Sequence, residues 1–469
     1  MDATVKAPTI DKLYALIKTQ AATILRLEQE VAELKRRLGL NRDNSSKPPS
    51  SDGLKKPARV KSLRERSGKP SGGQPGHRGE TLRQIENPDI IKQHKAWNCA
   101  HCRKKLTEAM VTGVMKRQVF DIPEPCLEVT EHQASIYTCI YCNGITKAAF
   151  PEDVISAAQY GPGVRAVAVY LNCGQLIPED RVAETMGDLF NVNLCPATIA
   201  VMGVKKAAEL KPVGDTIAAQ VAAAPVKHLD ETGFRIGRRT QWLHVASTPG
   251  LTSYRVAAKR NSLPAITTGI VTHDHWQPYF TMSGVQHALC NAHHLRELKA
   301  LIEIEQEPWA TRMYAFLLQA CRTVHRAWER DAEALSVSTQ RRLRRLYDKI
   351  IATGLAFHRR KPPLLKTGVR GRRPRRTGYN LVLRLRDYKD DVLRFAEDFS
   401  VPFTNNQAER DLRMMKVKQK ISGCFRSYAG AENFATLRGV ISTARKQSWN
   451  ILDTLVKSPA ELLFRLSGS

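Results

Sequence analysis

The sequence predicts a multidomain protein of the α/β class. Strand-like runs rich in apolar and β-branched residues are concentrated between Val226 and Asp274, and helical periodicity covers most of the chain around them. The length of 469 residues is enough for several domains. In order, we expect a coiled coil at 1–40, a basic linker at 41–88, a cysteine-rich domain at 89–150, a helical domain at 151–215, an α/β domain at 216–448 with a helical insertion at about 291–400, and a C-terminal tail at 449–469.

The charge of the chain indicates a polyanionic partner. Lys and Arg number 73 against 45 Asp and Glu, which gives a formal net charge of +28. Nucleic acid is the commonest partner of such a basic protein. No apolar run is long enough to span a bilayer, and the first residues do not resemble a signal peptide. We therefore expect a cytoplasmic protein without a membrane partner, whose ten Cys are thiols or metal ligands.

The N-terminal segment carries a heptad repeat. Its apolar positions are separated by steps of three and four, with Gln20 as one polar break: Ile10, Leu13, Ile17, Ile24, Leu27, Val31, Leu34 and Leu38. An a/d pattern sustained over four heptads predicts a coiled coil and therefore a homo-oligomer. The alternative is an amphipathic helix that packs on its own protein.

The expected linker has no apolar period. Asn44–Gly53 and Ser71–Gly79 are rich in Ser, Pro and Gly, and basic residues dominate between them. A solvated spacer and a basic arm that follows phosphates are both consistent with this composition.

Two C-x-x-C pairs predict a zinc ribbon. Cys99 and Cys102 form the first pair, and Cys139 and Cys142 form the second. Four thiolates hold Zn²⁺ tetrahedrally and leave no open position, so this zinc would be structural. Cys126 and His101 are possible substitute ligands.

A short helical pair follows in the helical domain. Arg181–Leu189 and Thr198–Glu209 are predicted helices, and Asn191–Asn193 is the turn that joins them. The arrangement resembles a DNA-binding helix-turn-helix, although any small helical bundle gives the same pattern.

Three acids stand at positions that can converge. Asp230 lies inside the predicted strand 226–236, Asp274 at the tip of another, and Glu409 at a predicted helix start. A single such Asp is usually a cap or an ion-pair partner, but three acids brought together repel one another unless a cation neutralises them. Hard oxygen ligands favour Mg²⁺ or Mn²⁺. Two such ions, roughly 3.5–4 Å apart, suit phosphoryl transfer.

The expected insertion is helical and then basic. Pro308–Arg330 and Ala332–Thr353 are predicted helices, and Arg341–Arg376 contains fourteen Lys or Arg and one acid. We expect Arg372, Arg373, Arg375 and Arg376 to contact phosphate, the alternative being a solvated charged face. Cys290 and its neighbours His293 and His294, at another helix start, are expected to pack or form hydrogen bonds rather than bind metal.

Several of these pieces occur together in a known family. They are the coiled coil, Asn44–Gly53, Gly72–Gly79, the C-x-x-C pairs, Asp230–Thr232, Cys290–Arg296 and Asn405–Arg410. In this combination the chain resembles the transposases of the bacterial insertion-sequence family sixty-six. The resemblance implies a ribonuclease H-like core whose D-D-E triad is Asp230, Asp274 and Glu409, with two Mg²⁺ ions.

The resemblance also implies a function and partners. The triad would cleave the ends of an insertion sequence and join the freed 3′-OH groups to target DNA. Arg410, Arg413 and Lys416 would steady the phosphates, and helper proteins from the same element are possible partners. The alternatives are a non-catalytic, zinc-containing DNA-binding regulator and a nuclease of the same fold that cuts without joining.

Overall fold

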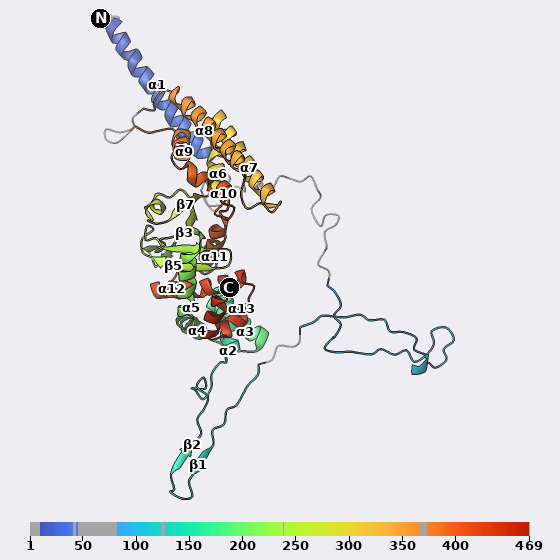
Figure 1. Cartoon of the computed structure of the whole chain (residues 1–469). Helices are drawn as coiled ribbons and strands as arrows, with labels where there is room; N and C mark the ends of the chain where they lie inside the picture. The colour runs from blue at the N-terminus through green and yellow to red at the C-terminus, as the bar shows by residue number, and fades with distance from the viewer. Residues whose placement is uncertain are drawn as a thin grey trace, which may run out of the picture.

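The computed structural model describes residues 10–40, 44–45, 82–122, 127–237, 239–365 and 373–468. Most of the expected linker lies outside these residues, as do Cys126 and Arg372. Figure 1 shows a sheet in the middle of an elongated body, a helical region beyond each end of it, and two extended arms.

A mixed five-stranded sheet lies at the centre, and it confirms the α/β class. Its strands are β3 (Val226–Ile236), β4 (Arg239–Ser247), β5 (Thr252–Ala257), β6 (Ile270–His273) and β7 (Gln286–Leu289). The order is β5-β4-β3-β6-β7, with β3, β4 and β5 antiparallel and with β6 and β7 parallel to β3. The longest strand, β3, is therefore central.

The sequence predicted four of these strands. β3 and β5 have the bounds predicted from the sequence, 226–236 and 252–257, and β4 and β6 differ by one or two residues from the predicted runs 241–247 and 269–272. We did not predict β7, because its four residues, Gln-His-Ala-Leu, contain no β-branched residue and no alternation. β7 is a strand because it pairs with β6, and a pattern within its own residues cannot predict that pairing.

Helices before and after the sheet in sequence share one core with it. Those before it are α2 (Pro162–Val169), α3 (Glu179–Phe190), α4 (Pro196–Glu209) and α5 (Lys211–Ala223), with the π-helical η3 (Tyr170–Gly174) after α2. Those after it are α11 (Asn406–Ser422), α12 (Tyr428–Lys446), α13 (Ile451–Val456) and α14 (Pro459–Ser467). The predicted helical pair is thus present as α3 and α4. Asn191, in the left-handed conformation, ends α3.

The residues expected to be a C-terminal tail instead form α13 and α14. Leu455, Leu462 and Leu466 are buried in the core that the sheet shares with α2 to α5. Ser458 and Glu461 form a capping box at the start of α14, which fixes where this helix begins. The chain end is therefore part of the folded body.

The insertion forms a second core. It contains α6 (Asn291–Ala300), the π-helical η5 (Leu301–Glu305), α7 (Pro308–Trp328), α8 (Val337–Arg359), α9 (Thr377–Asp387) and α10 (Lys389–Glu397). Helix α8 begins later than predicted, because the Ser336 hydroxyl accepts a hydrogen bond from the Thr339 N–H and caps the helix.

No helix among the described residues is long and apolar enough to cross a membrane.

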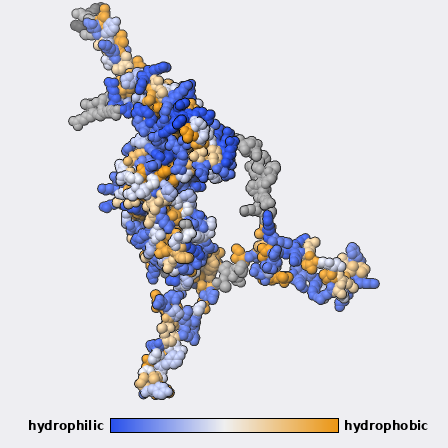
Figure 2. All heavy atoms as spheres, viewed as in Figure 1, coloured by the Kyte–Doolittle hydropathy of each residue, from blue (hydrophilic) through white to orange (hydrophobic). Residues whose placement is uncertain are grey.

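The N-terminal helix α1 (Ile10–Gly39) runs beside the insertion and projects beyond it (Figure 1). The Leu365 N–H donates to Gln29 Oε1 at 3.1 Å, so Gln29 lies on the face toward the insertion. The apolar seam is on another face. Leu27 is 49% exposed and Leu34 is 56% exposed, and Figure 2 shows apolar surface along the projecting helix. The seam therefore does not pack on the rest of this chain.

The cysteine-rich segment is not a compact domain in this structure. None of the described residues between 82 and 160 is buried. Regular structure there is limited to η2 (Glu108–Met110) and to a hairpin of β1 (Ile136–Thr138) and β2 (Ile145–Lys147). The two extended arms of Figure 1 carry η2 and the hairpin separately, so the expected compact ribbon is absent from the described residues.

Candidate active site

Adjacent parallel strands place the first two acids. β3 pairs with β6 in register up to His228 and Thr272. Two residues further along the two strands are Asp230 and Asp274. Because side chains repeat with period two along a strand, Asp230, inside β3, and Asp274, directly after β6, lie on the same face of the sheet at neighbouring positions. The pairing of β3 with β6 thus brings Asp230 close to Asp274.

Asn405 fixes the third acid. This residue is the N-cap of α11, and its side-chain amide donates to the Leu229 carbonyl at 2.7 Å. Its Oδ1 lies 2.9 Å from His228 Nδ1. Both partners are on β3, so Asn405 anchors the start of α11 directly beside Asp230. Glu409 is one helical turn further, and its N–H donates to the Asn405 carbonyl at 3.3 Å.

The electrostatics show that the three acids are close together. Burial raises the pKa of Asp230, the neighbouring charges of Glu231, Asp274 and Glu409 act in the same direction, and together they bring it to about 8. A hydrogen bond from the Glu231 N–H to Asp230 Oδ1, at 2.8 Å, opposes this rise. A buried carboxylate with further carboxylates beside it is a suitable donor set for a hard divalent cation, whose charge would remove the repulsion.

A fourth acid, Glu231, was missed as a part of the site. Its side chain is 2% exposed, and Oε1 accepts hydrogen bonds from Arg260 at 2.6 and 2.9 Å. The Tyr279 hydroxyl donates to its other oxygen. The Arg260 guanidinium lies 4.2 Å from the centre of the Trp276 ring. Glu231 therefore holds the segment that follows Asp274 against β3, which is a positioning role. In the sequence, the only indication of this role was that Glu231 directly follows Asp230.

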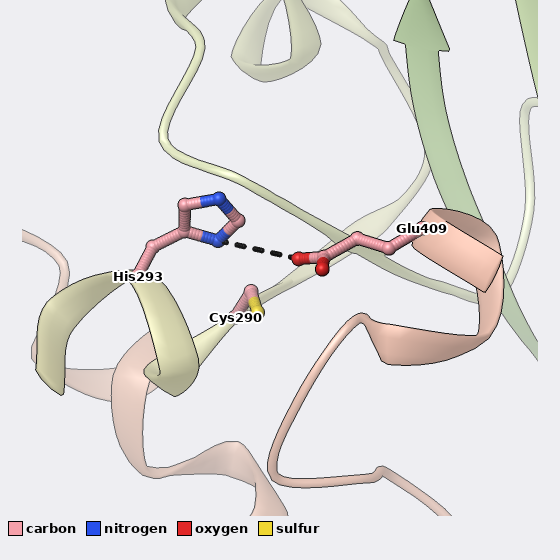
Figure 3. A group of neighbouring side chains, drawn as sticks. All are labelled: Cys290, His293 and Glu409. Atoms are coloured by element: carbon pink, nitrogen blue, oxygen red, sulfur yellow. Dashed lines mark ion pairs between the residues drawn. The ribbon is translucent and has the colours of Figure 1, made fainter. Parts of the chain in front are cut away.

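Cys290 and His293 lie against Glu409 (Figure 3). His293 Nδ1 is 3.9 Å from Glu409 Oε1, and an Arg296 guanidinium nitrogen is 3.8 Å from Glu409 Oε2. The sulfur of Cys290, His293 Nδ1 and a Glu409 oxygen lie within 4.8 Å of one another. Cys290 and His293, which were expected to pack or form hydrogen bonds, thus form a C-x-x-H pair that faces the third acid.

The charge state of His293 depends on these neighbours. Burial lowers its pKa, but the neighbouring Cys290 thiol and the charge of Glu409 outweigh burial and raise the pKa to about 9. Arg296 opposes that rise. The thiol of Cys290, the imidazole of His293 and the carboxylate of Glu409 thus lie close to one another.

The residues predicted to contact phosphate lie on α11, the helix that carries Glu409. Arg410, Arg413 and Lys416 are exposed and recur every third residue. Lys416 donates to the Gly233 carbonyl at 3.4 Å, and Asp230 raises its pKa against the stronger lowering by burial. Lys416 therefore lies near Asp230. Arg410 donates to Gln407 Oε1 at 2.8 Å on the same helix.

The other predicted basic group is elsewhere. Arg373 and Arg375 immediately precede α9, and Arg376 is the N-cap of α9, in the part of the insertion near α1 (Figure 1). The Arg375 guanidinium lies 5.9 Å from the centre of the Tyr379 ring. The structure does not bring these residues to the acids; any DNA contact there would be a separate one.

Each cysteine pair closes its own tight turn. The Cys99 N–H donates to the Lys104 carbonyl at 2.8 Å, and the Cys139 N–H donates to the Gly144 carbonyl at 2.9 Å. Backbone N–H groups, first that of Cys102, lower the pKa of Cys99, and those of the second turn, first that of Tyr141, lower the pKa of Cys139. The two turns are alike, but their four sulfur atoms are not close enough together in this structure to bind one metal ion.

Sequence comparison decides the family. The family described as "Transposase IS66 family" matches residues 157–433, more than half of the chain. The chain belongs to the IS66 family of transposases. The matched region of this IS66-family transposase contains all three acids, together with Cys290 and His293.

Two further matches are more limited. A family of unknown function (DUF6444) matches residues 2–83, a range that contains α1. The uncharacterized protein y4jO of Sinorhizobium fredii (strain NBRC 101917 / NGR234) is 36% identical over 96 residues, which is 19% of this IS66-family chain. The match spans 30% of the length of that relative.

Proposed function

We propose that this chain is a DNA transposase that cleaves the ends of an insertion sequence and joins the 3′-OH ends to target DNA. The observation that carries the proposal is the convergence of Asp230, Asp274 and Glu409, each from a different element of the α/β core, inside the region matched to the transposase family. The mixed sheet with acids on its central strands also supports a ribonuclease H-like core. Mg²⁺-dependent cleavage of terminal DNA that requires all three acids tests it.

The three carboxylates would hold Mg²⁺ or Mn²⁺. When bound there, such ions would stabilise the attacking and leaving oxygens of an in-line displacement. The protein groups around them have separate tasks. Asn405 holds the helix that carries Glu409, and Glu231 holds the segment after Asp274. Lys416 and Arg410, at the open side of α11, would attract and orient the phosphate that is cut.

DNA binding would depend strongly on salt. The net charge of +28 favours a large sequence-independent component of affinity. Replacing Arg372, Arg373, Arg375 and Arg376 by Gln is expected to flatten the slope of log K against log salt, by up to about 0.9 per lost phosphate contact.

Fluorescence anisotropy at several salt concentrations measures this slope. The matched control removes four exposed charges from α1, at Lys18, Arg26, Lys35 and Arg37, and should leave the slope closer to that of the wild type. If both variants change it equally, the basic segment makes no special contact with DNA.

We propose that α1 joins copies of the chain through its exposed seam. Charge at Leu27 and Leu34 should disrupt the oligomer, because buried a/d residues contribute most of the stability of a coiled coil. Sedimentation of Leu27→Glu plus Leu34→Glu is therefore expected to show a smaller species. Ala15→Glu plus Ala22→Glu adds the same charge off the seam and should sediment as wild type. A seam variant that also sediments as wild type would contradict this proposal.

We further propose that Cys99, Cys102, Cys139 and Cys142 bind one structural Zn²⁺ that draws the two turns together. The segment has no buried described residue, so metal ligation would supply the cross-link that a core does not. Metal analysis should find one zinc fewer per chain in Cys99→Ser plus Cys139→Ser than in wild type. Cys195→Ser plus Cys424→Ser, at two exposed cysteines outside these turns, should lose none. Equal zinc in both variants would exclude the site.

A further inference from the structure

We propose that Cys290, His293 and Glu409 form a second cation site, for a borderline-soft divalent ion of the Zn²⁺ class. A thiolate and an imidazole select such ions, whereas the oxygen-only triad selects Mg²⁺ or Mn²⁺. Three protein ligands would leave a fourth position for water. The site adjoins the proposed catalytic centre and differs from it in donor chemistry.

Two helix starts supply the ligands of this site. Cys290 is the N-cap of α6, and His293 follows three residues later, with its N–H bonded to the Cys290 carbonyl at 3.2 Å. Residues three apart on a helix lie on one face, so both side chains point the same way. The Asn405 N–H donates to the Cys290 sulfur at 3.1 Å, which places the start of α11, and Glu409 with it, opposite that face.

The ligand atoms are nearly at metal-binding separations. Tetrahedral zinc with bonds of about 2.0–2.3 Å separates its ligand atoms by roughly 3.4–3.6 Å. His293 Nδ1 and Glu409 Oε1 are 3.9 Å apart, and all three ligand atoms lie within 4.8 Å of one another. Side-chain shifts of about 1 Å or less would close the set, which is within rotamer adjustment.

Both facing atoms are also buried without hydrogen-bond partners. His293 Nδ1 and Glu409 Oε1 are inaccessible to solvent and make no hydrogen bond. Buried polar atoms are normally satisfied, and an ion between these two would satisfy both. Arg296 faces the other oxygen of Glu409, Oε2, at 3.8 Å, which leaves Oε1 directed at His293. Glu409 is thereby shared between two sites.

Cobalt titration of the full chain tests the site. Because thiolates in the two arm turns would also bind cobalt, the background variant carries Ser at Cys99, Cys102, Cys139 and Cys142, which are on segments outside the core. In this background, Co²⁺ is expected to give a sulfur-to-cobalt charge-transfer absorption that saturates at one equivalent.

Substitutions identify the ligands. Cys290→Ser should remove the charge-transfer band. His293→Gln and Glu409→Gln should each weaken Co²⁺ binding by about 10–100-fold or more, since even groups around a ligand have effects of this size. Cys321→Ser, on α7, is the matched control and should leave the band and the affinity unchanged.

The outcomes are distinct. The absence of the band in the background, or its persistence in Cys290→Ser, overturns the proposal. If Cys290→Ser is misfolded by circular dichroism, unchanged affinity in His293→Gln overturns it instead. Sharing of Glu409 with the catalytic centre depends on the proposed function, whereas cobalt binding does not. A cobalt band without Mg²⁺-dependent cleavage contradicts only the proposed function, and cleavage without the band contradicts only this site.

Discussion

Asp230→Asn is expected to abolish Mg²⁺-dependent cleavage while leaving DNA affinity equal or higher. The substitution removes a carboxylate ligand from the centre of β3, and losing even one group that stabilises a transition state costs about 10²–10³-fold in rate. Removing a negative charge does not weaken the attraction to phosphate. Gel-based cleavage of terminal DNA and anisotropy with the same DNA measure the two effects separately.

The controls for this prediction separate chemistry from folding. Because the pKa of Asp230 is raised to about 8, the neutral amide resembles the form that the metal-free protein holds near neutral pH, and the fold should be retained. Asp188→Asn, at an exposed position on α3, should cleave as wild type. Asp274→Asn and Glu409→Gln should fail as Asp230→Asn does. Cleavage by Asp274→Asn alone would show that another group supplies the second ligand.

Asn405→Ala is expected to lower the free energy of unfolding by about 2–5 kcal/mol. The side chain bonds the Leu229 carbonyl and His228, both inside the sheet, and each buried group left without a partner costs about 1–3 kcal/mol. Denaturant unfolding measures the change. Asn406→Ala, at the next and exposed position, is the matched control and should change stability by less than about 0.5 kcal/mol.

The same variant should lose activity beyond its loss of stability. Asn405 holds the first turn of α11, so its removal frees Glu409 one turn later, and small misplacements of catalytic groups cost as much as about 10²-fold. Cleavage is therefore measured under conditions where the variant is still fully folded. Normal cleavage there would mean that Asn405 stabilises the fold without positioning Glu409.

Local patterns in the sequence predicted four of the five strands and the elements that position the three acids. β3 carries an apolar, β-branched run around Asp230, and Asp274 follows a run of the same kind. Their parallel pairing then brings the acids together. Glu409 lies in the first turns of α11, and Asn405 holds the start of this helix. The sequence indicated Asn405 only as part of a family resemblance, because its hydrogen-bond partners on β3 are distant in sequence.

The features that sequence did not predict depend on contacts between distant segments. Cys290 and His293 were expected to pack or form hydrogen bonds, because nothing in α6 indicates that α11 would place Glu409 opposite them. The C-terminal residues were taken for a tail, although Leu462 and Leu466 fill a core made largely by helices near residue 200. In the cysteine-rich segment the two C-x-x-C pairs predict zinc ligands, but the backbone keeps the two turns on separate arms.

A strand-transfer assay distinguishes a transposase most directly from a nuclease of the same fold. Purified full-length protein is mixed with pre-cleaved terminal DNA of its own element, a target plasmid and Mg²⁺, and joined products are resolved on a gel. We expect joined products with wild type and none with Asp230→Asn, Asp274→Asn or Glu409→Gln. Cleavage of intact ends without any joining, or joining that persists in the three variants, would contradict the catalytic role proposed for these acids.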